Sequence, residues 1–400
     1  MSPATWTVWG GKTRSLEEGE NGEECVDGVL LPGLVNAHAH LDLSSAGSLP
    51  AEGTFPDWLA RVGQARQVGQ DLEGSAHHEV SSLVQRGVVS LGDIDASGGQ
   101  TTQVRRRSGM AGVSYLEVVG VADRVARRRL EHALEWFEQL SGPQRDVGIS
   151  PHAPYSVHQD VLEEIARAAG RRKIPLAMHL AESVEETRFL LHGDGPFLGF
   201  LEKLGHGLPF SRVPGMRPIQ YAEKLGLLKA GCLVVHGNDL DREDLDLLAR
   251  RGSSVVYCHG THQHFERPPH RLHELTEVGI NLALGTDSAA SNQEVDLVGE
   301  IGRLLQDRPE VDPLCILQAA TSGGLRALGF DPGPADFQAG SPAHGMLVGP
   351  APDDCEAMSA EDLVHWAFSA QVDILETFLH GEKAAKMKPL QSLQRAALVP

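Results

Sequence analysis

The stretch Leu31-Pro32-Gly33-Leu34-Val35-Asn36-Ala37-His38-Ala39-His40-Leu41 decides the fold. An apolar run, typical of a buried strand, ends here in His-Ala-His. Residues two apart in an extended strand point to the same side, so His38 and His40 present two imidazoles to one point. Such a pair suits a divalent metal such as zinc. Because His-x-His also arises by chance, the pair needs support from the rest of the chain.

Four later strand-like runs also end in a histidine or an aspartate. They are Gly148-Ile149-Ser150-Pro151-His152, Leu176-Ala177-Met178-His179, Leu233-Val234-Val235-His236 and Leu282-Ala283-Leu284-Gly285-Thr286-Asp287. The architecture that gathers many strand ends around one site is the (β/α)8 barrel, with its active site at the carboxyl face of the strands. Strand-like and helical segments alternate, as a parallel sheet requires. We therefore expect an α/β protein with a (β/α)8 TIM barrel, in which His38 and His40 close the first strand and Asp287 the eighth.

The composition is acidic, and we expect neither a membrane span nor a secretory signal region. Lys and Arg number 35 against 54 Asp and Glu, a net charge of −19, which argues against a nucleic acid or an anionic membrane as partner. The five scattered cysteines lack CxxC spacing and fit a reduced, cytoplasmic protein. No run approaches the ~20 apolar residues of a membrane span, and no signal region opens the chain.

Taken together, the motifs resemble the amidohydrolase superfamily over about residues 29–330, and most closely its mononuclear deaminases and aminohydrolases. In chain order they are Pro-Gly-Leu-Val-Asn-Ala-His-Ala-His, His-Leu-Ala-Glu, Val-His-Gly and Gly-Thr-Asp-Ser. The resemblance implies a hydrolase acting on carbon–nitrogen bonds other than peptide bonds, specifically a cyclic amidine deaminase. It also implies a small β-sandwich built from both chain ends, here reduced because the N-terminal segment is short.

We accordingly predict a metal-dependent barrel over residues 29–330 and a small composite β subdomain from residues 1–28 and 331–400. Residues 372–381 read as a strand and turn that could pair with the N-terminal piece. Residues 193–217 are rich in Gly and Pro, and we expect them to form a loop inserted over the barrel mouth.

The resemblance assigns a role to each motif residue. The predicted metal ligands are His38, His40, His179 and Asp287, holding one divalent ion, zinc in preference to iron. Such an ion lowers the pKa of its bound water from about 15.7 to roughly 7, so that hydroxide can attack an amino-substituted purine ring. Glu182 would shuttle protons to the ring and to the leaving ammonia, His236 would orient the water, and Asp287 would accept its proton. The fourth strand carries no lysine of the kind that bridges two metals in binuclear relatives, so we predict a single metal.

Five residues are predicted to contact the substrate: His152, Tyr155, Trp58, His262 and Ser291. The cluster His259, His262 and His264 leaves two interpretations open, a second metal site or a substrate-pocket loop, and we prefer the loop.

Local phrases around His152, His179 and Gly193 are similar to those of aminodeoxyfutalosine deaminases, which act in the futalosine route to menaquinone. The implied reaction replaces an adenine amino group with a carbonyl and releases ammonia. That substrate carries a carboxylate, which Arg matches in a bidentate manner. The candidate partners are Arg61, Arg66, Arg188 and Arg267.

Two alternatives stay open. One is another aminohydrolase, acting on guanine, on S-adenosylhomocysteine or adenosine, or on a triazine-type ring. The other is a non-catalytic binding homologue, suggested by the short N-terminus and by His259 but opposed by the complete set of motif residues. A cytidine-deaminase type of zinc site is excluded because the chain lacks Pro-Cys-x-x-Cys. The expected partner is a small nucleoside-like substrate, and a homodimer is left open.

Overall fold

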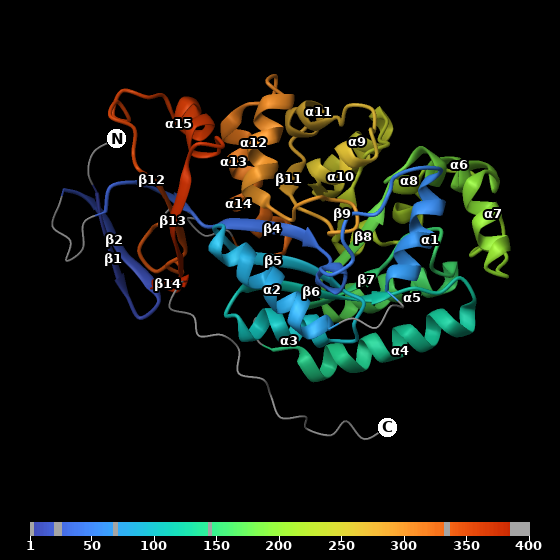
Figure 1. The fold of residues 1–400 in the computed structure, drawn as a ribbon. Coiled ribbons are helices and arrows are strands. Elements are labelled where there is room, and N and C mark those ends of the chain that lie inside the picture. The colour runs from blue at the N-terminus through green and yellow to red at the C-terminus, as the bar shows by residue number, and fades with distance from the viewer. Residues whose placement is uncertain (1–3, 20–25, 67–70, 143–145, 332–336, 385–400) are drawn as a thin grey trace.

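Eight parallel strands form the centre of the protein. The computed structural model describes residues 4–19, 26–66, 71–142, 146–331 and 337–384 (Figure 1). The strands neighbour one another in chain order. Their bounds are β4 Leu34–Ala39, β5 Val88–Asp95, β6 Ala111–Val118, β7 Val147–Pro151, β8 Leu176–Leu180, β9 Cys232–His236, β10 Ser254–Tyr257 and β11 Asn281–Leu284. The predicted α/β barrel is confirmed.

The first and last strands of the barrel meet beside His38. The backbone N–H groups of Thr286 and Asp287 both donate to the His38 carbonyl, each at 3.0 Å. The Asn36 amide adds two hydrogen bonds to Thr286, one to its hydroxyl at 2.7 Å and one from its backbone N–H at 3.1 Å. A Cβ on Gly285 would lie 2.8 Å from the Cβ of His38, so only glycine permits this approach. Asn36 and Gly285 thus close the barrel at its functional end.

A small apolar cluster fills the barrel below the site. Side chains from most of the strands contribute to it, among them Val35, Ala37, Val113 and Val235. The pairing register of β4 shifts between Asn36 and Ala39. Because such irregularities re-aim side chains, β4 turns Val35 and Ala37 into this cluster and still directs the next residue, His38, to the site.

Helices cover the outside of the barrel (Figure 1). Their bounds are α1 Phe55–Ala65, α2 Leu72–Gln85, α3 Gln100–Arg107, α4 Asp123–Leu140, α5 Gln159–Arg172, α6 Val184–His192, α7 Pro196–Lys203, α8 Pro218–Lys224, α9 Arg242–Arg251, α10 His259–His264, α11 Leu272–Glu277, α12 Leu297–Asp307, α13 Pro313–Ala319, α14 Ser322–Ala327 and α15 Ala360–Ala367. The helix α4 buries Ala126, Leu130 and Ala133 at helical spacing, which places one face of the helix against the barrel.

The segment 193–217 is not the continuous loop that its composition predicts. It contains α7, which starts with Gly195 as N-cap and Pro196 in the first turn. Proline at this position is pre-organised for a helix, and Phe197 and Leu201 bury one face of the turn that follows. The Gly and Pro residues here therefore mark a helix start as well as a loop.

The chain ends form two small sheets beside the barrel. A hairpin joins β1 Ala4–Trp9 to β2 Lys12–Glu18, and an antiparallel sheet has the order β14-β13-β12-β3. The four strands are β3 Val29–Pro32, β12 Gly345–Gly349, β13 Asp373–Leu379 and β14 Glu382–Lys383. The Trp6 ring of the hairpin contacts the rings of Phe337 and Phe378 at 5.1 and 5.4 Å. N- and C-terminal segments therefore pack together.

The division into a barrel and a β subdomain at residues 28/29 and 330/331 stays a prediction. That division assigns β3 to the barrel, whereas β3 pairs with β12 in the small antiparallel sheet. Within the described ranges, no helix is both long enough and apolar enough to cross a bilayer.

Candidate active site

The strand ends bring four histidines and one aspartate together. His38 lies in β4 and His40 directly after it, His179 lies in β8, His236 ends β9, and Asp287 follows β11. The Nε2 atoms of His40 and His179 are 3.3 Å apart. Asp287 Oδ1 lies 3.4 Å from His38 Nε2 and 3.5 Å from His40 Nε2. The parallel topology thus joins residues that are far apart in the sequence.

This cluster has the donor chemistry of a divalent metal site. The ligand atoms of His38, His40 and His179 lie within 4.8 Å of one another, as do those of His38, His236 and Asp287. Neither ring nitrogen of His38 has a well-formed hydrogen bond among the described residues, although both are buried. Burial lowers the pKa of His179 to about 3 and that of His40 and His236 well below 6.5. The imidazoles of His40, His179 and His236 are therefore neutral and keep lone pairs for a metal.

Asp287 is oriented by two hydroxyl groups. Its Oδ2 accepts hydrogen bonds from Thr261 at 3.0 Å and from Ser291 at 2.9 Å. Burial alone would raise the pKa of Asp287, but the adjacent imidazoles, that of His38 above all, hold it well below its usual range. The ionised carboxylate therefore turns Oδ1 to the histidines.

Glu182 lies beside this cluster on the turn after β8. Its side chain is buried, and Oε1 lies 3.7 Å from His236 Nε2 and 3.8 Å from Arg267 Nη2. Burial raises the pKa of Glu182 well above its ordinary value, and the Arg267 charge opposes this only in part. The raised pKa favours the protonated form of this carboxyl group, which can donate its proton.

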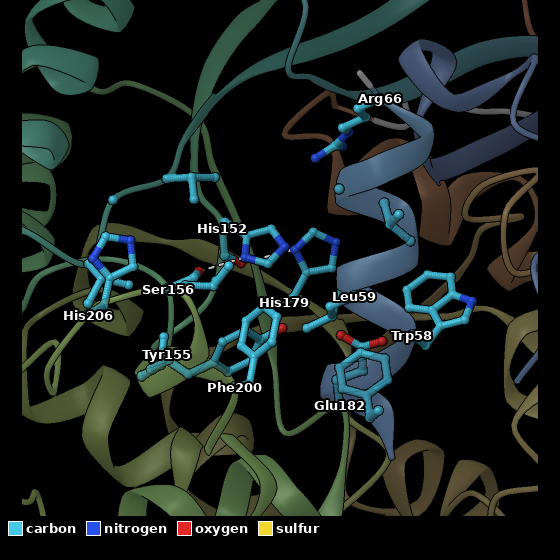
Figure 2. Close-up of a pocket in the computed structure, with 18 of the residues that line it drawn as sticks. Trp58, Leu59, Arg66, His152, Tyr155, Ser156, His179, Glu182, Phe200 and His206 are labelled. Atoms are coloured by element: carbon cyan, nitrogen blue, oxygen red, sulfur yellow. Dashed lines mark hydrogen bonds between the residues drawn. The ribbon is translucent and has the colours of Figure 1, made fainter. Parts of the chain in front are cut away.

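A cavity of about 330 Å³ leads to these groups. Its polar base includes His40, His179, Glu182, His236 and Asp287. Figure 2 shows Trp58 and Leu59 projecting from α1 on one side and Tyr155 and Phe200 on the other. Apolar and aromatic walls above a few polar groups are typical of a site for a small organic ligand.

Three of the five predicted substrate contacts line this cavity: His152, Tyr155 and Trp58. The Nδ1 of His152 hydrogen-bonds Ser156 Oγ at 2.6 Å, and its backbone carbonyl accepts from His179 Nδ1 at 3.0 Å (Figure 2). Burial lowers the pKa of His152 to about 3, so its ring is neutral.

The other two, His262 and Ser291, are not among the lining residues. Ser291 donates to Asp287 as described above, and His262 Nδ1 lies 3.2 Å from Asn238 Oδ1. His259 bonds Tyr257 Oη at 3.0 Å and Asp307 Oδ2 at 2.9 Å. In the described part of the chain the histidines of α10 form no metal-binding group.

The four arginines proposed to bind a substrate carboxylate differ in their position relative to the cavity. Arg66 lines the cavity, with Nε 2.8 Å from Asp42 Oδ2 and Nη1 3.5 Å from Glu117 Oε2. Arg267 stays beside Glu182. The two others point elsewhere, Arg61 to backbone carbonyls and Arg188 to Asp194 at an exposed position. The charge of Arg66 is thus shared between two acids.

Sequence reasoning missed two basic residues of the cavity wall, Arg129 on α4 and His206 after α7. In the described ranges no carboxylate lies within 4.0 Å of the Arg129 guanidinium. The only sequence signal for it was its place on a helix that follows a barrel strand.

Comparison with known proteins extends these observations. The amidohydrolase family matches residues 29–382. An aminodeoxyfutalosine deaminase of Deinococcus radiodurans is 29% identical over 319 residues, covering 77% of this chain and 75% of that protein. A 5-methylthioadenosine/S-adenosylhomocysteine deaminase of Haloarcula marismortui is 25% identical over 401 residues, covering 95% and 87%.

A similar solved structure is that of Helicobacter pylori aminofutalosine deaminase in complex with methylthio-coformycin. Its TM-score is 0.80 at 19% identity, and 94% of each chain is covered. At this sequence identity, the similarity shows a shared fold. Because the family match spans the whole barrel, including the five clustered donors, the chain belongs to the amidohydrolase family.

Proposed function

We propose that this amidohydrolase is a metal-dependent deaminase that replaces an amino group on a purine-like ring with a carbonyl and releases ammonia. One observation carries the proposal: Glu182, a buried acid with a raised pKa, lies beside the histidine–aspartate donor set at the base of an aromatic-walled cavity. The two relatives described above are both deaminases.

Four residues would hold one divalent metal: His38, His40, His179 and Asp287. Imidazole nitrogens and a carboxylate are the ligands zinc prefers, and iron is the alternative. When bound, such an ion lowers the pKa of water at the site to roughly 7, which makes hydroxide available.

The chain's own residues would then move the protons. Glu182 protonates the ring nitrogen next to the amino-bearing carbon while water attacks that carbon. His236 hydrogen-bonds the attacking water, and Asp287 accepts its proton. Transfer of that proton to the amino group makes ammonia the leaving group. As the C–N bond breaks, the hydroxyl formed by the attack gives its proton to Glu182, which leaves the ring carbonyl and restores the acid, so one C–O bond forms and one C–N bond breaks. Such acid–base catalysis typically contributes about 10²–10⁴-fold.

The substrate that we place first is aminodeoxyfutalosine, which would give the protein a role in menaquinone biosynthesis. The similar local phrases and the Deinococcus relative support it. Deamination of 5-methylthioadenosine or S-adenosylhomocysteine is the second candidate, because the Haloarcula relative matches 95% of this chain.

The test is ammonia release by metal-loaded protein from a panel of aminopurine and aminotriazine compounds that includes both candidates. Glu182→Gln is the control, since it keeps the shape of the side chain but cannot carry the proton. Release by the native protein and loss in the control would support the proposal. Equal rates in both proteins would refute the role of Glu182, and no release from any compound would favour the non-catalytic alternative.

A further inference from the structure

His262 is a buried histidine whose contacts lead away from the cavity and toward the backbone of Glu182. It lies on α10, is 7% exposed, and places Nδ1 3.2 Å from Asn238 Oδ1. Burial lowers the pKa of His262 to about 4. The ring is therefore neutral near pH 7 and has one N–H to donate.

Asn238 determines which nitrogen of His262 carries that proton. The Asn238 amide Nδ2 lies 3.1 Å from the Glu182 carbonyl oxygen. A carbonyl can only accept, so the NH2 group of Asn238 must face Glu182 and its oxygen must face His262. The Asn238 oxygen also can only accept, so this bond forms when His262 Nδ1 carries the ring's N–H; the carbonyl of Pro268 is a second acceptor beside the same ring. The bond to the ring thereby supports the same orientation of the amide that the Glu182 carbonyl requires.

The turn that carries Glu182 has an unfavourable backbone and needs such support. Ala181 has φ +52°, a left-handed conformation that residues with a side chain rarely adopt. Gly237 N–H donates to the Leu180 carbonyl at 3.1 Å, and Asp239 N–H donates to the Ala181 carbonyl at 2.8 Å. These two bonds are backbone to backbone. The Glu186 carboxyl group accepts from the N–H groups of Ala181 and Glu182 at 3.2 and 2.8 Å, and the bond to the Glu182 carbonyl comes from the Asn238 side chain. It therefore depends on how that side chain is oriented.

We propose that His262 is a positioning residue for Glu182: through Asn238 it holds the turn so that the carboxyl group stays beside His236. The inference rests on the proton-shuttle role proposed above. Thr261, the preceding residue of α10, donates to Asp287 Oδ2. The short helix α10 thus contacts both proposed proton-transfer groups: Asp287 directly through Thr261, and Glu182 through His262 and Asn238.

The test compares two substitutions of His262 that differ in where they place a donor. In His262→Asn the amide nitrogen falls near the position of Nδ1, and in His262→Gln it falls near that of Nε2. Displacing a catalytic group by about 1 Å can cost roughly 100-fold in rate. We expect His262→Gln to lower kcat for ammonia release by about tenfold or more with KM and metal content unchanged, and His262→Asn to recover most of the loss.

Two further variants serve as a second test and as a control. Asn238→Asp keeps the shape but removes the NH2 donor, so it should lose kcat as His262→Gln does, and it decides the matter if His262→Gln fails to fold. Gln263→Leu, on the same helix but directed to Asp307, is the matched control and should behave as the native protein. Native kcat in His262→Gln and Asn238→Asp, or equal losses in His262→Gln and His262→Asn, would overturn the inference.

A readout without substrate separates this inference from the proposed function. In the metal-loaded protein, amide hydrogen exchange in residues 180–187 should be faster in His262→Gln than in the native protein or in His262→Asn. If Glu182→Gln retains native turnover, the shuttle role fails. If Glu182→Gln is inactive while His262→Gln exchanges and turns over like the native protein, only the positioning role fails.

Discussion

Asp42 lies beside His40 and is not one of the proposed metal ligands, so a substitution of Asp42 tests how the ring of His40 is held for metal binding. His40 Nδ1 and Asp42 Oδ1 are 3.9 Å apart, both buried, and neither has a hydrogen-bond partner in the described part of the chain. Arg66 Nε holds the other oxygen of Asp42 at 2.8 Å. Because His40 turns Nε2 toward His179, Nδ1 is left to donate to Asp42. We predict that Asp42→Asn weakens metal binding by loosening the His40 ring.

The size of the effect follows from the geometry. Removing a carboxylate that orients a metal-binding histidine typically costs about 10–100-fold in metal affinity. The 3.9 Å separation is longer than a good hydrogen bond, so we expect the lower end, about tenfold or ~1.4 kcal/mol. Arg66 keeps Glu117 as a partner at 3.5 Å in the variant, which limits other damage. Burial raises the pKa of Asp42 to about 6, so the carboxyl group is ionised above that pH, where the comparison should be made.

The assay is a zinc titration of metal-free protein in competition with a chromophoric chelator. Asp194→Asn is the matched control, because it removes the same charge from an exposed ion pair with Arg188. We expect the Kd for zinc to rise about tenfold in Asp42→Asn and to stay unchanged in the control. An unchanged Kd in Asp42→Asn would refute the idea that this carboxylate orients His40.

Three further predictions concern stability, specificity and barrel closure. Burial raises the pKa of Glu186 from 4.5 to about 8, so the stability that its protonated form contributes is complete below pH 4.5 and is lost as the pH rises through 8. The free energy of unfolding in urea should therefore fall less between pH 4.5 and 8 in Glu186→Gln than in the native protein. An equal pH dependence of the two proteins would contradict the assignment. Arg129→Met should raise KM about tenfold or more for a carboxylate-bearing substrate but leave KM for a neutral nucleoside unchanged, as steady-state kinetics would reveal. Gly285→Ala should lower Tm and metal content, since its Cβ would meet His38 at 2.8 Å, whereas Gly170→Ala, with open space around it, should not.

The barrel could be predicted because its signals are local. Each strand is a short apolar run, and parallel strands all present their carboxyl ends to one face. That rule is sufficient to bring His38, His179 and Asp287 together without any knowledge of the loops. The glutamate of His-Leu-Ala-Glu needed the family resemblance as well, because nothing in its spacing distinguishes it from a solvated residue at a helix start.

The rest depends on contacts between loops that the sequence does not specify. His262 and Ser291 sit one layer behind the cavity, and periodicity cannot tell that layer from the lining. Arg129 is one of several arginines on α4, and the rotation of the helix decides which faces the cavity. The helix α7 was missed because Gly195 and Pro196 mark helix starts as well as loops.

Closure of the barrel beside His38 has a consequence for how the protein is made. Of the barrel strands, synthesis delivers β4 first and β11 last. Thr286 and Asp287 follow β11, and their bonds to the His38 carbonyl join the two ends of the barrel. A nascent chain that has not yet released Asp287 from the ribosome has neither a closed ring nor a full donor set. Since metal binding is linked to folding, an ion held by this donor set would bind only after β11 has joined the barrel and would hold that strand in place.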